Sequence, residues 1–197
     1  MMVQLIRARV RDREALERAK DRWERELRPG AVDFVGSTGG ITADGELVLL
    51  ARFGSRSAAQ TNSARPEQDA WWQEVLAALE GEPTVKDTEN VDVLFDHGCD
   101  TAGFVQVMEG SGDEAALRAL DSKFLESALP LRPDVLGAYR AYFADGSFAD
   151  VTYFASEAEA RAGESQEMPP EVAALFGELE GVVSDMRYHD LSEPWVT

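Results

Sequence analysis

Apolar residues recur along the chain with two spacings, and each spacing predicts a different kind of element. Residues 3–10 (VQLIRARV) alternate apolar and basic side chains over part of their length, which predicts a strand. From Arg13 to Leu27, apolar residues return at every third or fourth position, which predicts an amphipathic helix. Pro29 and Gly30 follow directly and end that helix.

The next segment predicts a hairpin, a broken helix and a last strand. Residues 31–35 and 46–53 form the hairpin around GSTGGITADG, whose Gly and Asp residues suit turns. Helical spacing then runs through residues 57–79, with a break at Pro66. Residues 84–92 predict the closing strand. The order β-α-β-β-α-β is the ferredoxin-like arrangement.

The second half of the chain repeats this pattern. The stretch 44–55 (DGELVLLARFGS) returns as 145–156 (DGSFADVTYFAS), at an offset of 101 residues. The helical faces return as well: Leu16, Ala19, Trp23 and Leu27 match Leu117, Leu120, Phe124 and Ala128 at the same offset. Turns, helical faces and helix stops recur in one order, so we interpret the chain as two copies of one unit.

The predicted organisation is a first repeat over residues 1–95, a linker over 96–102 and a second repeat over 103–197. Both alternating sets of residues 46–53 are largely apolar, so the strand needs cover on both faces. We therefore predict an α+β fold in which two four-stranded ferredoxin-like sheets pack against each other, with helices outside, as a barrel within one chain.

The composition of the chain limits the classes of molecule that it is expected to bind. The net charge is −18, and residues 100–197 carry most of the excess acid. Such a field repels phosphate backbones and anionic lipid, so we expect neither nucleic acid nor a membrane as partner. No apolar run approaches the roughly 20 residues that span a bilayer. The single cysteine, Cys99, and a charged N-terminus without a signal-peptide pattern predict a cytoplasmic protein.

The pattern resembles a known superfamily. The β-α-β-β-α-β order, the strands ending in F-x-S (residues 53–55 and 154–156) and the Ala-rich helix that follows are similar to dimeric α/β-barrel proteins. Within them, the chain looks most like the antibiotic-biosynthesis monooxygenase group. Members usually pair as dimers of single units, so the resemblance implies that the fused copies supply both halves in a monomer with a pseudo-dimeric barrel, or in a homodimer.

The two copies differ most after the F-x-S motif. Copy one reads RSAAQTNSARPEQDAWW and places Asn62, Arg65, Gln68, Trp71 and Trp72 there, whereas copy two has small or acidic residues. The resemblance implies a pocket bordered by this helix and loop. An amide, a guanidinium and an indole can orient an aromatic or carboxylated ligand. In the opposing interpretation, Trp72 belongs to the core, Arg65 pairs with an acid and Asn62 caps the break.

Three further polar residues are candidates for substrate binding. Gln4 and Gln106 occupy similar places in the two opening strands and point either into a pocket or towards solvent. Asp150 interrupts an otherwise apolar strand. If Asp150 is buried, its pKa is raised and it can act as a base. If it pairs with Arg140 or Arg161, its role is structural.

The sequence offers little for a metal or a cofactor. His97 and Cys99 lie two residues apart, but no second Cys-His set completes a zinc site. His189 is expected at the surface. The resembling group often has a His near the position of Asn62, which this chain lacks, so the prediction is that no haem or other cofactor is bound.

The sequence leaves three hypotheses for the function. The leading hypothesis is a small-molecule enzyme or binding protein similar to cofactor-free monooxygenases, with an aromatic or quinone-like substrate in a pocket of the first repeat. Asn62 and Arg65 would stabilise the substrate anion there, with Trp71 or Trp72 as the wall. The alternatives are a non-catalytic barrel with a ligand-binding or vestigial pocket, and a haem-binding or haem-degrading protein.

Overall fold

The computed structural model describes all 197 residues, which divide into two compact units. The first unit comprises residues 1–89 together with Thr197, and the second comprises residues 90–196. The elements of the first repeat are β1 (Met2–Val10), α1 (Arg13–Arg22), the π-helix η1 (Trp23–Leu27), the 3₁₀ turn η2 (Arg28–Gly30), β2 (Phe34–Ile41), β3 (Glu46–Phe53), α2 (Arg56–Ser63), α3 (Pro66–Ala78) and β4 (Leu79–Thr88).

The second unit repeats the same order after an additional strand. Its elements are β5 (Val91–Asp96), η3 (Cys99–Thr101), β6 (Phe104–Gly112), α4 (Glu114–Ser127), η4 (Leu129–Leu131), β7 (Val135–Tyr142), β8 (Ser147–Phe154), α5 (Glu157–Glu164), α6 (Pro170–Glu180), β9 (Val183–Leu191) and β10 (Trp195–Val196). Both repeats therefore follow the predicted β-α-β-β-α-β order.

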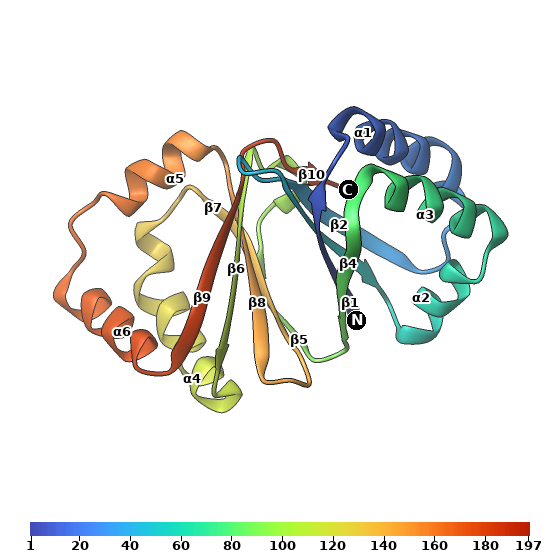
Figure 1. Cartoon of the computed structure of the whole chain (residues 1–197). Coiled ribbons are helices and arrows are strands. Elements are labelled where there is room, and N and C mark those ends of the chain that lie inside the picture. Colours follow the sequence, from blue (N-terminus) through green and yellow to red (C-terminus); the bar gives the residue numbers. More distant parts are fainter. The chain divides into compact units, whose positions relative to one another are not determined.

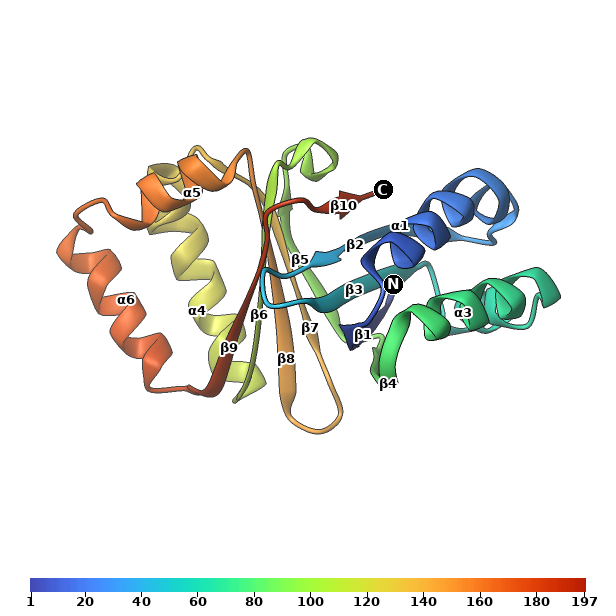
Figure 2. The same ribbon diagram turned by 45° about the horizontal axis from the view of Figure 1, so that its top comes forward.

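Each sheet has five strands. The orders are β10-β2-β3-β1-β4 and β5-β7-β8-β6-β9, and the recorded pairings are antiparallel. Figure 1 shows α1, α2 and α3 on one face of their sheet, and Figure 2 shows α4, α5 and α6 on one face of theirs. The predicted α+β fold with two tandem ferredoxin-like repeats is confirmed, but the prediction of four strands in each sheet is wrong.

The fifth strands are short segments that follow each repeat. Residues 91–96 lie within or just beyond the strand predicted over 84–92, and they pair with β7 in the second sheet. β10 lies at the edge of the first sheet, next to β2. At that edge Thr197 exchanges two backbone hydrogen bonds of 3.0 Å with Ser37. These segments carry too few residues for a periodic pattern to mark them as strands.

The position of β2 is a second correction. We expected a strand at 31–35 and a long Gly-rich turn, whereas residues 34–41 form the strand and the turn shrinks to 42–45. Gly39 explains the difference. A Cβ at Gly39 would lie 2.8 Å from the Leu49 side chain, so glycine serves close packing between paired strands and does not mark a turn. Gly45, with φ of +85°, is the turn glycine.

The two long helices of the first repeat also end differently from the prediction. The helix predicted from Arg13 to Leu27 changes at Trp23 into the wider π-helix. The later helix ends at Ala78, because Leu79 already has the extended backbone that starts β4. Gly81 lies inside that strand with φ of +74°.

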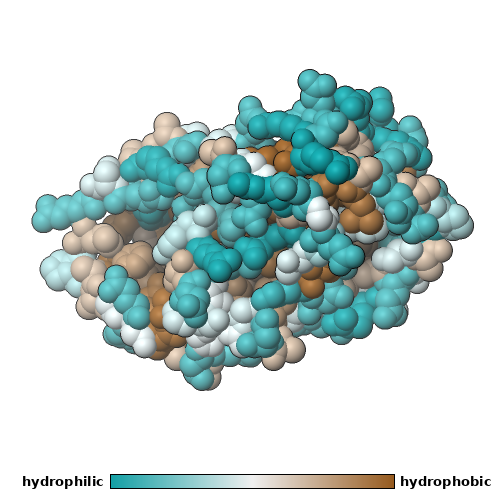
Figure 3. All heavy atoms as spheres, in the orientation of Figure 1, coloured by the Kyte–Doolittle hydropathy of each residue, from teal (hydrophilic) through white to brown (hydrophobic).

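Each sheet has apolar side chains on both faces, as the sequence of residues 46–53 suggested. On β3, Leu47 and Val48 point to opposite faces, yet both are at most 1 % exposed. In the second sheet Val151 and Phe148 lie on opposite faces and are at most 3 % exposed. The outer surface contrasts with this core, because hydrophilic atoms dominate the face drawn in Figure 3.

The Ser of each F-x-S motif caps the helix that follows. The Ser55 hydroxyl accepts a hydrogen bond of 3.2 Å from the Ala58 amide, and the Ser156 hydroxyl accepts one of 3.2 Å from the Glu159 amide. Both serines have extended backbone, as an N-cap requires. The repeated motif therefore has a structural reason in both copies.

Replacing this cap gives a first prediction. We expect Ser55→Ala to lower the free energy of unfolding by about 1 kcal/mol, because one amide of the first turn loses its acceptor. Ser63→Ala, at the other end of α2, is the matched control and should change it by less than half as much. Urea denaturation of both variants measures this, and equal losses would contradict the capping role.

Candidate functional site

An aromatic cluster lies between the sheet and the helices of the first unit. Trp23 packs edge-on against Phe34 at a centroid distance of 4.8 Å, and Phe34 packs against Phe53 at 5.5 Å. Trp71 lies 6.3 Å from Trp23. All these rings are only partly buried. The cluster therefore joins the sheet to α3 and keeps part of its aromatic surface accessible.

Trp72 extends this cluster along α3. Its ring lies 6.0 Å from Trp71. The Trp71 indole donates a hydrogen bond of 2.7 Å to the carbonyl of Ala19 on α1, so its orientation is fixed. Both predicted indoles thus lie together in the first repeat, where they hold α3 against α1.

Asn62 uses its whole amide within the fold. The side chain is 4 % exposed, its oxygen accepts from the Val32 amide at 2.9 Å, and its nitrogen donates to the carbonyls of Val32 and Ala58 at 2.8 and 2.9 Å. These bonds fasten α2 to the loop before β2. An amide with three backbone partners holds the loop and has little capacity left for a ligand.

Arg65 has hydrogen-bond partners within the protein for only part of its guanidinium group. Its Nε donates to Glu67 at 2.9 Å and its Nη1 donates to the carbonyl of Leu27 at 3.3 Å. Nη2 has no hydrogen-bond partner in the protein, and the side chain is 18 % exposed. Nearby, Gln68 accepts from the Trp23 indole at 3.2 Å. The Arg65 carbonyl accepts a hydrogen bond of 3.0 Å from the Gln68 amide, so Arg65 is joined to the cluster through Gln68 and keeps Nη2 as a spare donor.

The second repeat has no equivalent cluster. Phe124 stands where copy one has Trp23, and it packs against Phe176 at 5.1 Å. The positions of Trp71 and Trp72 are taken by Glu171 and Val172, at an offset of 100. The difference between the copies that the sequence suggested is thus a difference in aromatic surface.

Gln4 and Gln106 make the same contact in the two units. The Gln4 amide donates to Asp87 at 3.1 Å, and the Gln106 amide donates to Asp190 at 2.9 Å. In each case the Asp lies directly opposite on the last strand of the repeat. The alternation of β1 places Gln4 on the same face as Met2, which pairs with Phe53 of the aromatic cluster.

Asp150 belongs to a buried ionic triad in the second unit. The Arg140 guanidinium donates to Asp150 at 3.1 and 2.5 Å from β7 to β8, and to Asp121 on α4 at 2.7 Å. The residues are 6 to 8 % exposed. The pairing with Arg140 is the structural alternative that the sequence offered for Asp150.

Copy one has no charged residues at the strand positions that correspond to Arg140 and Asp150. Gly39 and Leu49 pair in the register of Arg140 and Asp150, at an offset of 101. Lys20 stands where copy two has Asp121, and it bonds to acids of its own helix instead. Duplication therefore preserved the backbone here, while one copy has an apolar pair and the other a salt bridge.

The triad has two carboxylates for one guanidinium. Burial raises the pKa of Asp121 above its usual range; Arg140 opposes this shift and Asp150 adds to it. Burial lowers the pKa of Arg140, but both carboxylates raise it by more. The Oδ2 atom of Asp121 is buried without a hydrogen-bond partner. Asp121 is thus the strained member of the triad.

Both histidines belong to the second unit. His189 is 6 % exposed, which corrects the expected surface position, and its Nε2 lies 3.2 Å from Glu109 on β6. His97 is exposed in the loop before η3. No group of three or more His, Cys, Asp or Glu side chains is arranged to hold a metal ion. No helix is long and apolar enough to cross a membrane.

A shallow groove of about 440 Å³ lies between α4 and α6 of the second unit. Its floor includes Leu120 and Val182, and the ion pair of Lys123 with Glu178 (2.7 Å) stands at its side. None of the residues predicted for substrate binding lines this groove.

Sequence reasoning missed several partners of the predicted residues. Asp87 and Asp190 are 103 residues apart whereas the repeat offset is 101, so alignment of the copies hid their equivalence. Asp121 was hidden because the helical pattern places it next to apolar Leu120. The sequence did contain a signal for each. Asp87 and Asp190 lie on strands that pair with the strands of the two Gln residues, and Asp121 lies on the helix that packs over Arg140.

Similarity to solved structures supports the class of fold. The chain matches a candidate monooxygenase from Lactobacillus acidophilus NCFM with a TM-score of 0.71 and 11 % identity, over 100 % of this chain and 98 % of that one. A candidate monooxygenase from Fusobacterium nucleatum subsp. nucleatum ATCC 25586 gives 0.76 and 6 %, over 99 % and 93 %. An anthrone oxidase-like protein gives 0.69 and 10 %, over 99 % and 92 %.

No protein-family model matches the sequence, and no curated protein matches it significantly. At these identities the structural likeness establishes fold alone. The chain has the tandem ferredoxin-like fold of these solved structures, so the predicted fold is confirmed.

The triad gives a prediction about pH. A carboxyl group whose pKa is raised by folding binds its proton more tightly in the native state than in the unfolded chain. Its contribution to stability therefore falls as the pH rises from the pKa of the unfolded chain through the pKa of the folded one. We expect Asp121→Asn, which cannot ionise, to gain stability relative to the wild type between pH 4 and pH 7. Asp100→Asn, on the exposed η3 turn, is the control. Urea denaturation at both pH values checks this, and a difference that is independent of pH would contradict it.

Proposed function

We propose that this protein is a monooxygenase-like enzyme that acts without a bound cofactor on a hydroxylated aromatic or quinone-like small molecule. The carrying observation is the half-buried indole cluster of the first unit, beside a guanidinium with a spare donor. The fold shared along the whole chain with candidate monooxygenases and an anthrone oxidase-like protein supports the class of reaction.

Under this proposal the substrate lies against the aromatic cluster of copy one. Trp71 and Trp72 offer flat apolar faces, which suit an aromatic ring. The Nη2 group of Arg65 is placed to donate to the oxygen of a deprotonated substrate. Charge on that oxygen activates the ring towards O₂. One atom of O₂ becomes a carbonyl oxygen on the ring. The ring hydrogen that it replaces and the proton of the substrate hydroxyl leave with the other atom as water.

Asn62 has a different role in this proposal from the one the sequence suggested. Its three backbone bonds hold the loop before β2, which also carries Phe34 into the cluster. It acts as a positioning residue for the wall of the site. Arg65 is left as the group that touches the substrate.

The competing function is a non-catalytic protein that binds a ligand or retains only a vestigial pocket. The complete use of the Asn62 amide favours this alternative, since it removes one of two expected anion stabilisers. Oxygen uptake separates the two functions. An enzyme consumes O₂ with hydroxylated anthrones or naphthols in buffer that contains a chelator, whereas a binding protein shows a thermal shift without uptake.

The residues present do not fit a haem group. Of the two histidines, His189 lies against Glu109 and His97 is exposed beside Phe95, whose ring is 5.4 Å away. Both histidines belong to the second unit, whereas the aromatic cluster belongs to the first. We therefore expect added haemin to keep the absorption spectrum of free haemin, with no shift of the Soret band on titration with protein. A saturable shift would contradict this prediction and favour the haem-binding alternative.

The site itself is tested through Arg65. A ligand present at about 100 times its Kd stabilises the folded protein by about 2.7 kcal/mol. We expect Arg65→Ala to reduce the thermal shift caused by hydroxylated aromatic compounds by more than half. Gln166→Ala, at the equivalent position of copy two, is the matched control and should keep the full shift. Equal shifts in both variants would remove Arg65 from the site.

A further inference from the structure

Gln68 connects Arg65 to the aromatic cluster of the first unit. Its backbone amide donates to the Arg65 carbonyl at 3.0 Å, and its side-chain oxygen accepts from the Trp23 indole at 3.2 Å. Gln68, Arg65 and Trp23 are all partly buried. Gln68 is therefore bonded both to the residue that carries the spare guanidinium donor and to the aromatic surface beside it.

The indole fixes the orientation of the Gln68 amide. An indole nitrogen only donates, so the amide must turn its oxygen towards Trp23. The amide nitrogen is then on the other branch of the side chain, where it has no hydrogen-bond partner in the protein and is not enclosed. Gln68 therefore keeps donors that are held in one orientation and are open to solvent or a ligand.

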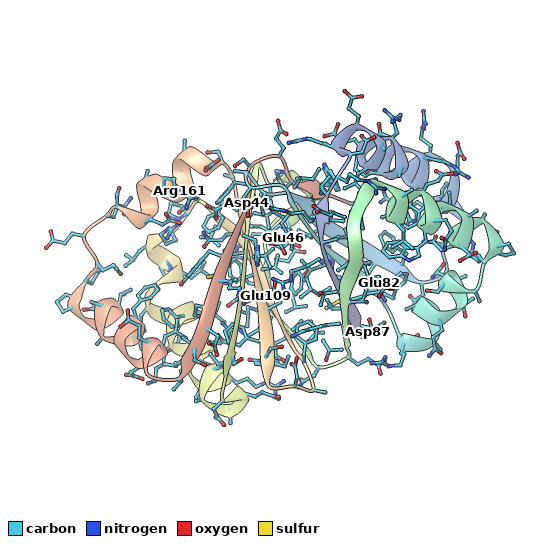
Figure 4. The ribbon with its side chains drawn as sticks, viewed as in Figure 1. Asp44, Glu46, Glu82, Asp87, Glu109 and Arg161 are labelled. Atoms are coloured by element: carbon cyan, nitrogen blue, oxygen red, sulfur yellow. The ribbon has the colours of Figure 1, made fainter.

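Gln4 and Gln106 use their amides in the opposite way. The Gln4 nitrogen donates to Asp87 at 3.1 Å, and the Gln106 nitrogen donates to Asp190 at 2.9 Å. Figure 4 labels Asp87, the first of these acceptors, on β4. In both strands the chain itself uses the amide donor, whereas in Gln68 it uses the amide acceptor and leaves the donor available.

The π-helix η1 is contacted at both ends by the first turn of α3. The Nη1 atom of Arg65 donates to the carbonyl of Leu27, the last residue of η1, while Gln68 accepts from Trp23, its first residue. In copy two, α4 continues as a regular α-helix through the corresponding residues 124–127. π-Helices are rare and are frequent at functional sites. The wider helix thus occurs in the copy that has the guanidinium and the amide.

Copy two lacks the paired donor and acceptor. Trp23 corresponds at an offset of 101 to Phe124, which has no N–H group. At the offset of 100 that aligns α3 with α6, Gln68 corresponds to Met168, which has no amide. The indole donor and the amide are therefore absent together, in the copy that also lacks the guanidinium of Arg65.

A neutral donor adds to what the guanidinium supplies alone. The Glu67 carboxylate lies 2.9 Å from Nε of Arg65 and offsets part of its charge. Donors whose orientation is fixed before the reaction stabilise a developing negative charge without reorganising. The Gln68 amide meets this condition because Trp23 holds it.

We propose that Gln68 is a second catalytic donor of the first unit, whose amide nitrogen donates to the substrate oxygen that Arg65 stabilises. This inference rests on the proposed function and adds to it a residue with a role in the reaction. Trp23 acts through Gln68 as a positioning residue, because its indole keeps the amide nitrogen free for the substrate.

Two neutral substitutions separate donation from support of the indole. Gln68→Met removes the amide donor, whereas Trp23→Phe keeps that donor and removes only the bond that orients it. We expect Gln68→Met to lower the rate of oxygen uptake with a hydroxylated anthrone about tenfold or more, and Trp23→Phe to lower it by less. Gln73→Met, on the exposed face of the same helix, is the control and should keep the wild-type rate.

A bound chromophore measures donation without turnover. The anion of 4-nitrophenol absorbs visible light, so its ionisation on the protein can be followed by pH titration of the absorbance. We expect the wild type to lower the pKa of the bound probe and Gln68→Met to raise it again by about one unit, the equivalent of a tenfold loss of anion stabilisation. Gln73→Met should leave the pKa of the bound probe at the wild-type value.

The outcomes distinguish this inference from the proposed function. Unchanged uptake and an unchanged probe pKa in Gln68→Met, together with loss of uptake in Arg65→Ala, would overturn the role of Gln68 alone. Equal losses in Gln68→Met and Trp23→Phe would also overturn it, since Gln68 would then only support the indole. Absence of uptake and of probe binding in the wild type would overturn both. Thermal melts verify folding, and Gln68→Glu, which keeps an acceptor for the indole, replaces Gln68→Met if that variant does not fold.

Discussion

The layer between sheet and helices is governed by one constraint: a polar atom buried there must have a partner. Leaving it without one costs on the order of 1–3 kcal/mol. Asn62 meets the constraint with three backbone bonds, and Arg140 meets it with two carboxylates. Where one atom of Asp121 fails to meet it, burial raises the pKa of the carboxyl group.

The same constraint distinguishes structural polar groups from candidates for ligand binding. A group whose hydrogen bonds are all made by the chain positions a loop, as Asn62 does. A group that is fixed on one side and keeps a spare donor or acceptor on the other has capacity for a ligand. Arg65 is of this second kind.

Duplication allowed the two copies to solve the same packing problem in different ways. Beneath the first helix of each repeat, one copy has Gly39 against Leu49 and the other has Arg140 against Asp150. The indoles of copy one are replaced by smaller or charged residues in copy two.

The sequence alone determined the repeat and the element order, because local periodicity and turn chemistry depend on residues that are close together in the chain. It also marked Asn62, Arg65 and the Trp pair as the place where the copies differ. Tertiary structure decided what these residues contact. The partners of Gln4, Asn62 and Asp150 lie elsewhere in the chain, and cross-strand register and helix packing bring them together. It also decided that Gly39 belongs to a strand, because only the packed Leu49 side chain shows why a Cβ is excluded there.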